Sequence, residues 1–126
     1  MPETSRTFAN IEIKQGEDYE LVITMDSTWV TTNKSWQCRI VKDFSGTTFT
    51  SADGAGQAYE EMTVAGDNSA KTITLSLTSA QTAGLPDDFE GYWDLVEKDT
   101  SPTPDSYTRQ AEGEVIVFNA ASVSTF

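Results

Sequence analysis

The chain has 126 residues, with 20 acidic and 8 basic side chains, a formal net charge of −12 and no histidine. A strongly negative surface repels nucleic-acid backbones and anionic membranes, so we expect neither as a partner. The lack of histidine removes the commonest general base and the commonest metal ligand. The length fits one domain, which can bury a core without disulfides or metals.

Alternation of apolar and polar side chains is the main pattern along the first two thirds of the chain. It buries one face of a strand and leaves the other in water, which is typical of antiparallel sheets. Clusters of Gly, Asn, Asp and Ser separate the alternating runs and predict turns. The expected strands lie, in chain order, near residues 8–13, 19–25, 36–40, 62–64 and 73–77.

A segment near 79–84 interrupts the strand pattern and predicts one helical turn. Thr78 or Ser79 can cap it, and Gly84 can end it. Strands then resume at 91–97, at 106–109 after a Pro-rich loop, and at 113–118. No helix long enough to connect parallel strands is expected. The sequence therefore predicts an all-β antiparallel sandwich of about eight strands.

The residues that could carry chemistry form no specific pattern. Cys38 is the single cysteine and alternates with apolar neighbours, which predicts a small core residue. The acidic clusters at 60–61 and 87–90 would need a polar groove to act as a glycosidase pair. Loops at 43–46 and 53–57 lack EF-hand spacing, and we expect turns there, with a structural calcium ion as the open alternative. We expect no enzyme activity, no cofactor and no metal ligand set.

The aromatic residues are the candidate interaction sites. Trp29 lies in a polar stretch, where it can fold back over the core end or anchor an interface. The strands that contain Trp93 and Phe118 are apolar on both faces, so they are central or covered by a partner. The candidate interface residues are Trp29, Trp93, Val123 and Phe126.

The domain organisation follows from these patterns. We expect residues 1–118 to form one sandwich domain of immunoglobulin-like or jelly-roll-like type. Residues 119–126 are too polar for a strand and form a tail that can become ordered on a partner. The first residues lack both the basic and the apolar segment of a signal peptide, so synthesis in a cytoplasm is expected.

Four segments together are similar to a known family. They are 16–21 (GEDYEL), 74–78 (TLSLT) with Thr82 and Leu85 after it, 91–95 (GYWDL) and 113–117 (GEVIV). Their order resembles the immunoglobulin-like β-sandwich domain of tailed-bacteriophage virion proteins, such as the N-terminal domain of baseplate upper proteins and small tail or capsid accessory proteins. The resemblance covers about residues 7 to 118.

The resemblance implies a non-enzymatic virion component, made in the host cytoplasm, that binds other virion proteins. It would act as capsid cement or decoration, or as a head or tail accessory adaptor. Symmetric assembly would make it a homo-oligomer on the particle, for which a trimer is one candidate. The alternative is a carbohydrate-binding module for host attachment, with Trp29 or Trp93 as the stacking platform.

Overall fold

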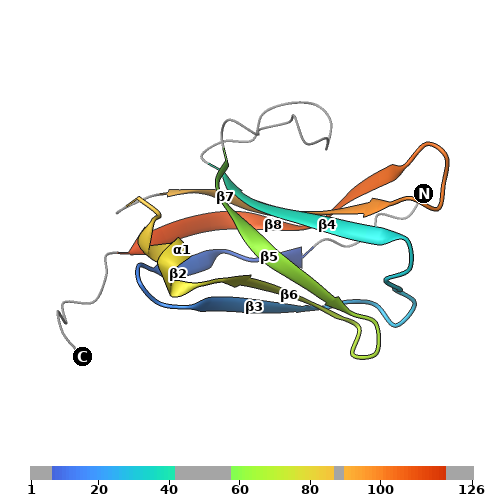
Figure 1. Ribbon diagram of the computed structural model, residues 1–126, viewed down its shortest axis with the longest axis horizontal. Helices are drawn as coiled ribbons and strands as arrows, with labels where there is room; N and C mark the ends of the chain where they lie inside the picture. The colour runs from blue at the N-terminus through green and yellow to red at the C-terminus, as the bar shows by residue number, and fades with distance from the viewer. Residues whose placement is uncertain (1–6, 42–57, 87–89, 119–126) are drawn as a thin grey trace.

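The computed structural model describes residues 7–41, 58–86 and 90–118. Within these ranges the protein is all-β, with one short helix (Figure 1). The expected all-β class and the helical turn are therefore confirmed. The elements are β1 (Thr7–Phe8), β2 (Ile11–Lys14), β3 (Tyr19–Thr24), β4 (Lys34–Val41), β5 (Ala58–Asp67), β6 (Thr72–Leu77), α1 (Ser79–Ala83), β7 (Glu90–Asp99) and β8 (Ser106–Phe118).

The helix α1 begins and ends where the sequence predicts. The Thr78 hydroxyl accepts a hydrogen bond from the Gln81 amide at 3.2 Å, and the Gln81 side chain accepts one from the Thr78 amide at 2.9 Å. This reciprocal pair is a capping box, and Gly84 is the C-cap. The buried Thr82 hydroxyl donates to the Glu17 carbonyl at 2.8 Å. The helix is thereby attached to the turn between β2 and β3.

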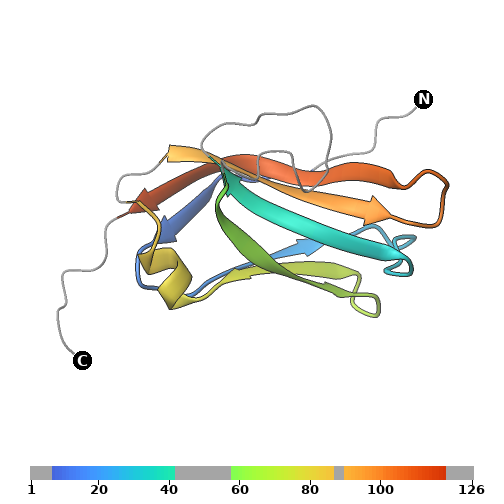
Figure 2. The same cartoon turned by 45° about the horizontal axis from the view of Figure 1, so that its top comes forward.

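One sheet runs through the described residues and curls over itself at β5. The strand order is β1-β8-β7-β4-β5-β6-β3, and β2 also pairs with β8. The first part of β5 pairs with β4, and the part from Thr63 to Asp67 pairs with β6. Strands β3 and β6 consequently lie across from β8, β7 and β4 (Figures 1 and 2). The apolar side chains fill the space between these two halves of the sheet.

The expectation of a wholly antiparallel arrangement is wrong at the first two strands. Strands β1 and β2 run parallel to β8, with Thr7 opposite Ala111 and Ile11 opposite Val115. The argument against parallel pairs considered only strands joined directly through a crossover helix. Here the parallel partners are separated by nearly the whole chain, so no crossover is needed.

The core consists of the inward side chains of both halves of the sheet. Trp93 is the largest side chain that is completely buried, and the indole nitrogen donates to the Ala9 carbonyl at 2.7 Å. Cys38 is also buried, as its alternating pattern predicts. The other apolar residues of the core that are at most 2% exposed are Ile13, Ile40, Ile73, Leu75, Leu77, Leu95, Ala111, Val115 and Val117.

Gly113 allows the N-terminal segment to approach β8 closely. A Cβ atom at this position would overlap the carbonyl group of Ala9 and would lie 2.8 Å from the indole nitrogen of Trp93. The Ala9 amide also donates to the Glu112 carbonyl at 3.1 Å. A glycine is therefore required where the link between β1 and β2 approaches β8.

We predict that Gly113→Ala lowers the free energy of unfolding by roughly 2–4 kcal/mol, through overpacking and loss of the buried indole hydrogen bond. Urea denaturation followed by tryptophan fluorescence measures the change. The control is Gly84→Ala, where the added carbon has ordinary contacts of 3.5 Å or more and φ is −81°. Equal stabilities of the two variants would show that Gly113 is not needed for close approach.

We also predict that Cys38 is unreactive in the folded protein. Burial raises the pKa of this thiol above its ordinary value, the charge of Asp94 raises it further, and Arg39 opposes the shift. The thiol therefore stays protonated and shielded at pH 8. Iodoacetamide should modify the native protein on the order of a hundredfold or more slowly than the chain in concentrated urea. Similar rates in both conditions would contradict the burial.

Candidate functional site

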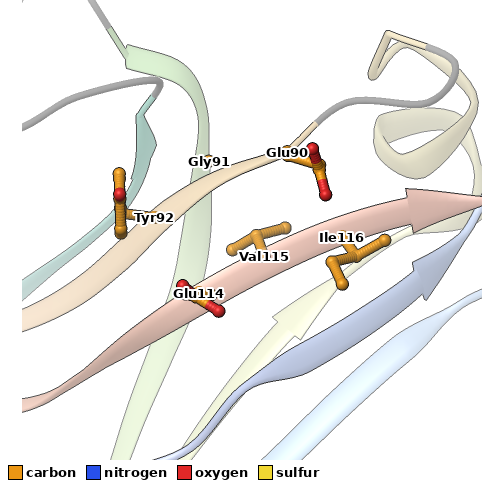
Figure 3. A pocket seen from close by; sticks show the side chains of 6 residues that line it. All are labelled: Glu90, Gly91, Tyr92, Glu114, Val115 and Ile116. Atoms are coloured by element: carbon orange, nitrogen blue, oxygen red, sulfur yellow. The ribbon is translucent and has the colours of Figure 1, made fainter.

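The outward side of strands β7 and β8 carries a hollow that we call the Ile116 pocket. Its volume is about 210 Å³. In Figure 3, the side chains of Glu90 and Tyr92 project from β7, and those of Glu114 and Ile116 project from β8. The lining residues are Glu90, Gly91, Tyr92, Glu114, Val115 and Ile116.

Strand register places carboxylate groups on both sides of Ile116. In the antiparallel pair, Glu90 of β7 lies opposite Ile116. In the parallel pair, Glu12 of β2 lies opposite Ile116 from the other side. Glu114 precedes Ile116 by two residues, so it shares the same face of β8. Directly opposite side chains of a sheet have Cβ atoms about 4.5–5.5 Å apart. A half-buried apolar side chain is thus surrounded by three acidic residues.

Exposed aromatic side chains extend this surface along the strands. Tyr92 is 38% exposed and lies opposite Glu114. Phe118 is 42% exposed and follows Ile116 by two residues on β8. Lys14 of β2 lies opposite Phe118. We call the surface formed by Glu12, Glu90, Tyr92, Glu114, Ile116 and Phe118 the Ile116 face.

The charges farther along the same side of the sheet are compensated within the domain. Asp94 of β7 is completely buried and lies 3.3 Å from Arg109 and 3.7 Å from Arg39. Burial raises the pKa of Asp94, and the two guanidinium groups oppose this shift. Arg109 also lies 3.9 Å from Glu112. The two arginines hold the Asp94 carboxylate by charge, at distances longer than those of ordinary charge-assisted hydrogen bonds.

The acids of the Ile116 face differ from Asp94 in their ion pairing. Within the described residues, no ion pair or hydrogen bond reaches the carboxylates of Glu12, Glu90 and Glu114. The same part of the chain contains no cluster of acidic, His or Cys residues suited to a metal ion.

Trp29 and Trp93, the tryptophans predicted at an interface, lie inside the domain. Trp93 has no exposed surface, and Trp29 is only 7% exposed. Trp29 has therefore folded back over the end of the core, which is one of the two arrangements that the sequence allows. Neither indole ring is presented as an anchor or as a platform for a sugar. The other predicted residues, Val123 and Phe126, lie outside the described residues.

A buried carboxylate explains the position of Trp29. The indole nitrogens of Trp29 and Trp36 both donate to Glu97 Oε2 at 2.9 Å. Lys34 Nζ lies 3.4 Å from Glu97 Oε1. The two rings lie with their centroids 6.0 Å apart, and Lys71 Nζ donates to the Trp29 carbonyl at 2.6 Å. This cluster fixes the loop before β4 on the core.

The sequence contained part of the signal for the Ile116 face. The strands that contain Trp93 and Phe118 are apolar on both faces. Trp93 is the interface residue that the sequence predicts in β7, but the structure buries Trp93 and exposes Tyr92. The acids around Ile116 were missed, because only the pairing of β2 and β7 with β8 brings them together.

The comparisons with known proteins add no relative. No family model matches this chain, and no curated protein matches it. In the described part of the chain, no helix has the length and apolar character needed to cross a membrane. The candidate site therefore depends on the geometry of the sheet alone.

We predict that Glu97→Ala lowers the free energy of unfolding by about 3–5 kcal/mol, because two indole donors and a lysine lose a buried partner. Glu97→Gln should cost less, since one side-chain oxygen remains to accept. Urea denaturation with tryptophan fluorescence measures both. The control Glu114→Ala removes an exposed carboxylate and should change stability by about 0.5 kcal/mol or less. A Glu97→Ala variant as stable as this control would contradict the role of the cluster.

Proposed function

We propose that this protein is a non-enzymatic structural component of a bacteriophage particle, which binds other virion proteins through the Ile116 face. The observation that carries the proposal of binding is an exposed apolar surface, with Tyr92, Ile116 and Phe118, beside a pocket edged by acids. Protein interfaces have such an apolar centre with a polar rim. The bacteriophage assignment rests on the resemblance of the four sequence segments.

The strand order supports an immunoglobulin-like sandwich as the finer fold. Such domains have strands B, E and D in one sheet and strands C, F and G in the other. In this chain, β3, β6 and the second part of β5 form one half, and β4, β7 and β8 form the other. Strands β3 to β8 thus correspond in order to B, C, D, E, F and G. This correspondence favours the immunoglobulin-like over the jelly-roll-like alternative.

The proposed role is capsid cement or decoration, or an adaptor at the head or tail. The partners are other virion proteins, and repeated copies on the particle make a homo-oligomeric arrangement part of the proposal. A second attachment surface is the edge strand β3, which ends the strand order and carries Val22 at 51% exposure. Edge strands present backbone groups to which another chain can add.

Particle attachment tests this proposal. We expect the protein in purified virions of the phage whose genome carries this sequence. The double variant Tyr92→Ser/Phe118→Ser should attach at least about tenfold less, which corresponds to about 1.4 kcal/mol of binding free energy. Quantitative immunoblots of virions reconstituted with each purified variant measure attachment.

The matched control is Val30→Ser, which removes an exposed apolar side chain from the loop before β4, outside the Ile116 face and the edge strand β3. It should attach like the unchanged protein. Absence of the protein from purified virions would refute the assignment to a particle. Equal attachment of the double variant and the control would refute the Ile116 face as the binding surface.

A further inference from the structure

We infer that the Ile116 pocket receives a lysine or arginine side chain of the protein partner. This inference rests on the proposed function, because it names the chemistry that the binding surface recognises. A basic side chain combines an apolar stem with a charged end. The Ile116 pocket offers a surface for each part.

The apolar part of the pocket suits the stem. Ile116 is half-buried at the centre, and Val115 and Gly91 are buried beneath the surface. Tyr92 stands at one end of the hollow (Figure 3). A volume of about 210 Å³ has room for several water molecules, which an alkyl stem can replace. Removal of this apolar surface from water favours binding.

The acidic part of the pocket suits the charged end. Glu90 and Glu114 lie diagonally across the β7–β8 pair, so a cation above Ile116 lies between them. Glu12 adds a third carboxylate from β2. None of these three carboxylate groups has an ion pair or hydrogen bond within the described residues, whereas Asp94 on the same side of the sheet has two arginines. Three uncompensated carboxylates therefore lie around one apolar side chain.

The charge of the domain selects the same kind of partner. With a net charge of −12, the chain attracts basic surfaces and repels acidic ones. Among the described residues of this face, Lys14 lies opposite Phe118 rather than opposite Ile116.

The test uses the whole chain labelled with ¹⁵N and four small probes. N-acetyl-lysine-N-methylamide and N-acetyl-arginine-N-methylamide carry both parts of the proposed ligand. N-acetyl-norleucine-N-methylamide has the stem without the charge, and methylammonium has the charge without the stem. We expect saturable shifts of the Gly91, Glu114 and Ile116 amide signals with the first two probes only. Added salt should weaken this binding, because the carboxylates are near the surface.

Two variants with changed charge separate the pocket from general attraction. Glu90→Gln/Glu114→Gln should weaken binding of the basic probes at least about fivefold, or roughly 1 kcal/mol. Glu20→Gln removes an exposed carboxylate of β3, in the other half of the sheet, and should leave binding of the probes unchanged.

Three results would overturn the inference. The first is shifts spread over the surface without saturation, and the second is equal binding by the double variant and by unchanged protein. The third is binding of norleucine or methylammonium as strong as that of the basic probes. If any of these occurs while Tyr92→Ser/Phe118→Ser still loses attachment to virions, the proposed function stands and only the assignment of the pocket falls. If Tyr92→Ser/Phe118→Ser still attaches to virions and Glu90→Gln/Glu114→Gln still binds the basic probes, both the proposed function and the assignment of the pocket are refuted.

Discussion

The hydrogen bond from the Trp93 indole to the Ala9 carbonyl is the interaction on which the rest of this structure depends. It forms because Gly113 lets the backbone of residue 9 approach β8 closely. The parallel pairing of β1 and β2 with β8 continues on both sides of this contact. It buries Ile11 and Ile13 in the core, and it places Glu12 beside Ile116 on the outside. The composition of the candidate site is thus a consequence of one close contact on the inner side of the sheet.

The domain holds two buried acids in different ways. The Glu97 Oε2 atom accepts hydrogen bonds from two neutral indole N–H groups, and Lys34 lies at ion-pair distance from Oε1. Both oxygens of this carboxylate therefore have close partners. Asp94 lies between two guanidinium groups at longer distances, and burial raises its pKa. Buried charges are costly unless they are compensated. Both positions follow from β7, which carries Asp94 and Glu97 and lies at the centre of its half of the sheet.

The sequence predicted those features that depend on neighbours along the chain. Alternation located β3 and β6, and the capping residues located α1, because strand faces and helix caps are set within a few residues. It did not predict the parallel pairing of β2 with β8, which joins residues about a hundred positions apart. Periodicity also left open which side of β7 faces inward. Trp93 and Tyr92 are both aromatic, and only the opposite half of the sheet determines that Trp93 is buried.

The dependence on residues that are distant in the sequence also explains why the acids of the candidate site were not predicted. Glu12, Glu90 and Glu114 are unremarkable in sequence, because acids are frequent in this chain. They become a group only through the register of three strands. For Trp29, the sequence allowed two arrangements. The choice depended on Glu97, a partner 68 positions away.

The parallel pairing of β2 with β8 has a mechanical consequence. The chain enters this ladder at the start of β1 and leaves it at the end of β8, and these two points lie at opposite ends of the ladder because its strands run parallel. A force that pulls the two ends apart therefore acts along the strands and loads the hydrogen bonds between them in shear. Bonds loaded in shear must break together, whereas bonds in an unzipping geometry break one after another. The parallel ladder therefore places the first and last described strands in a shear geometry toward extension along the strands.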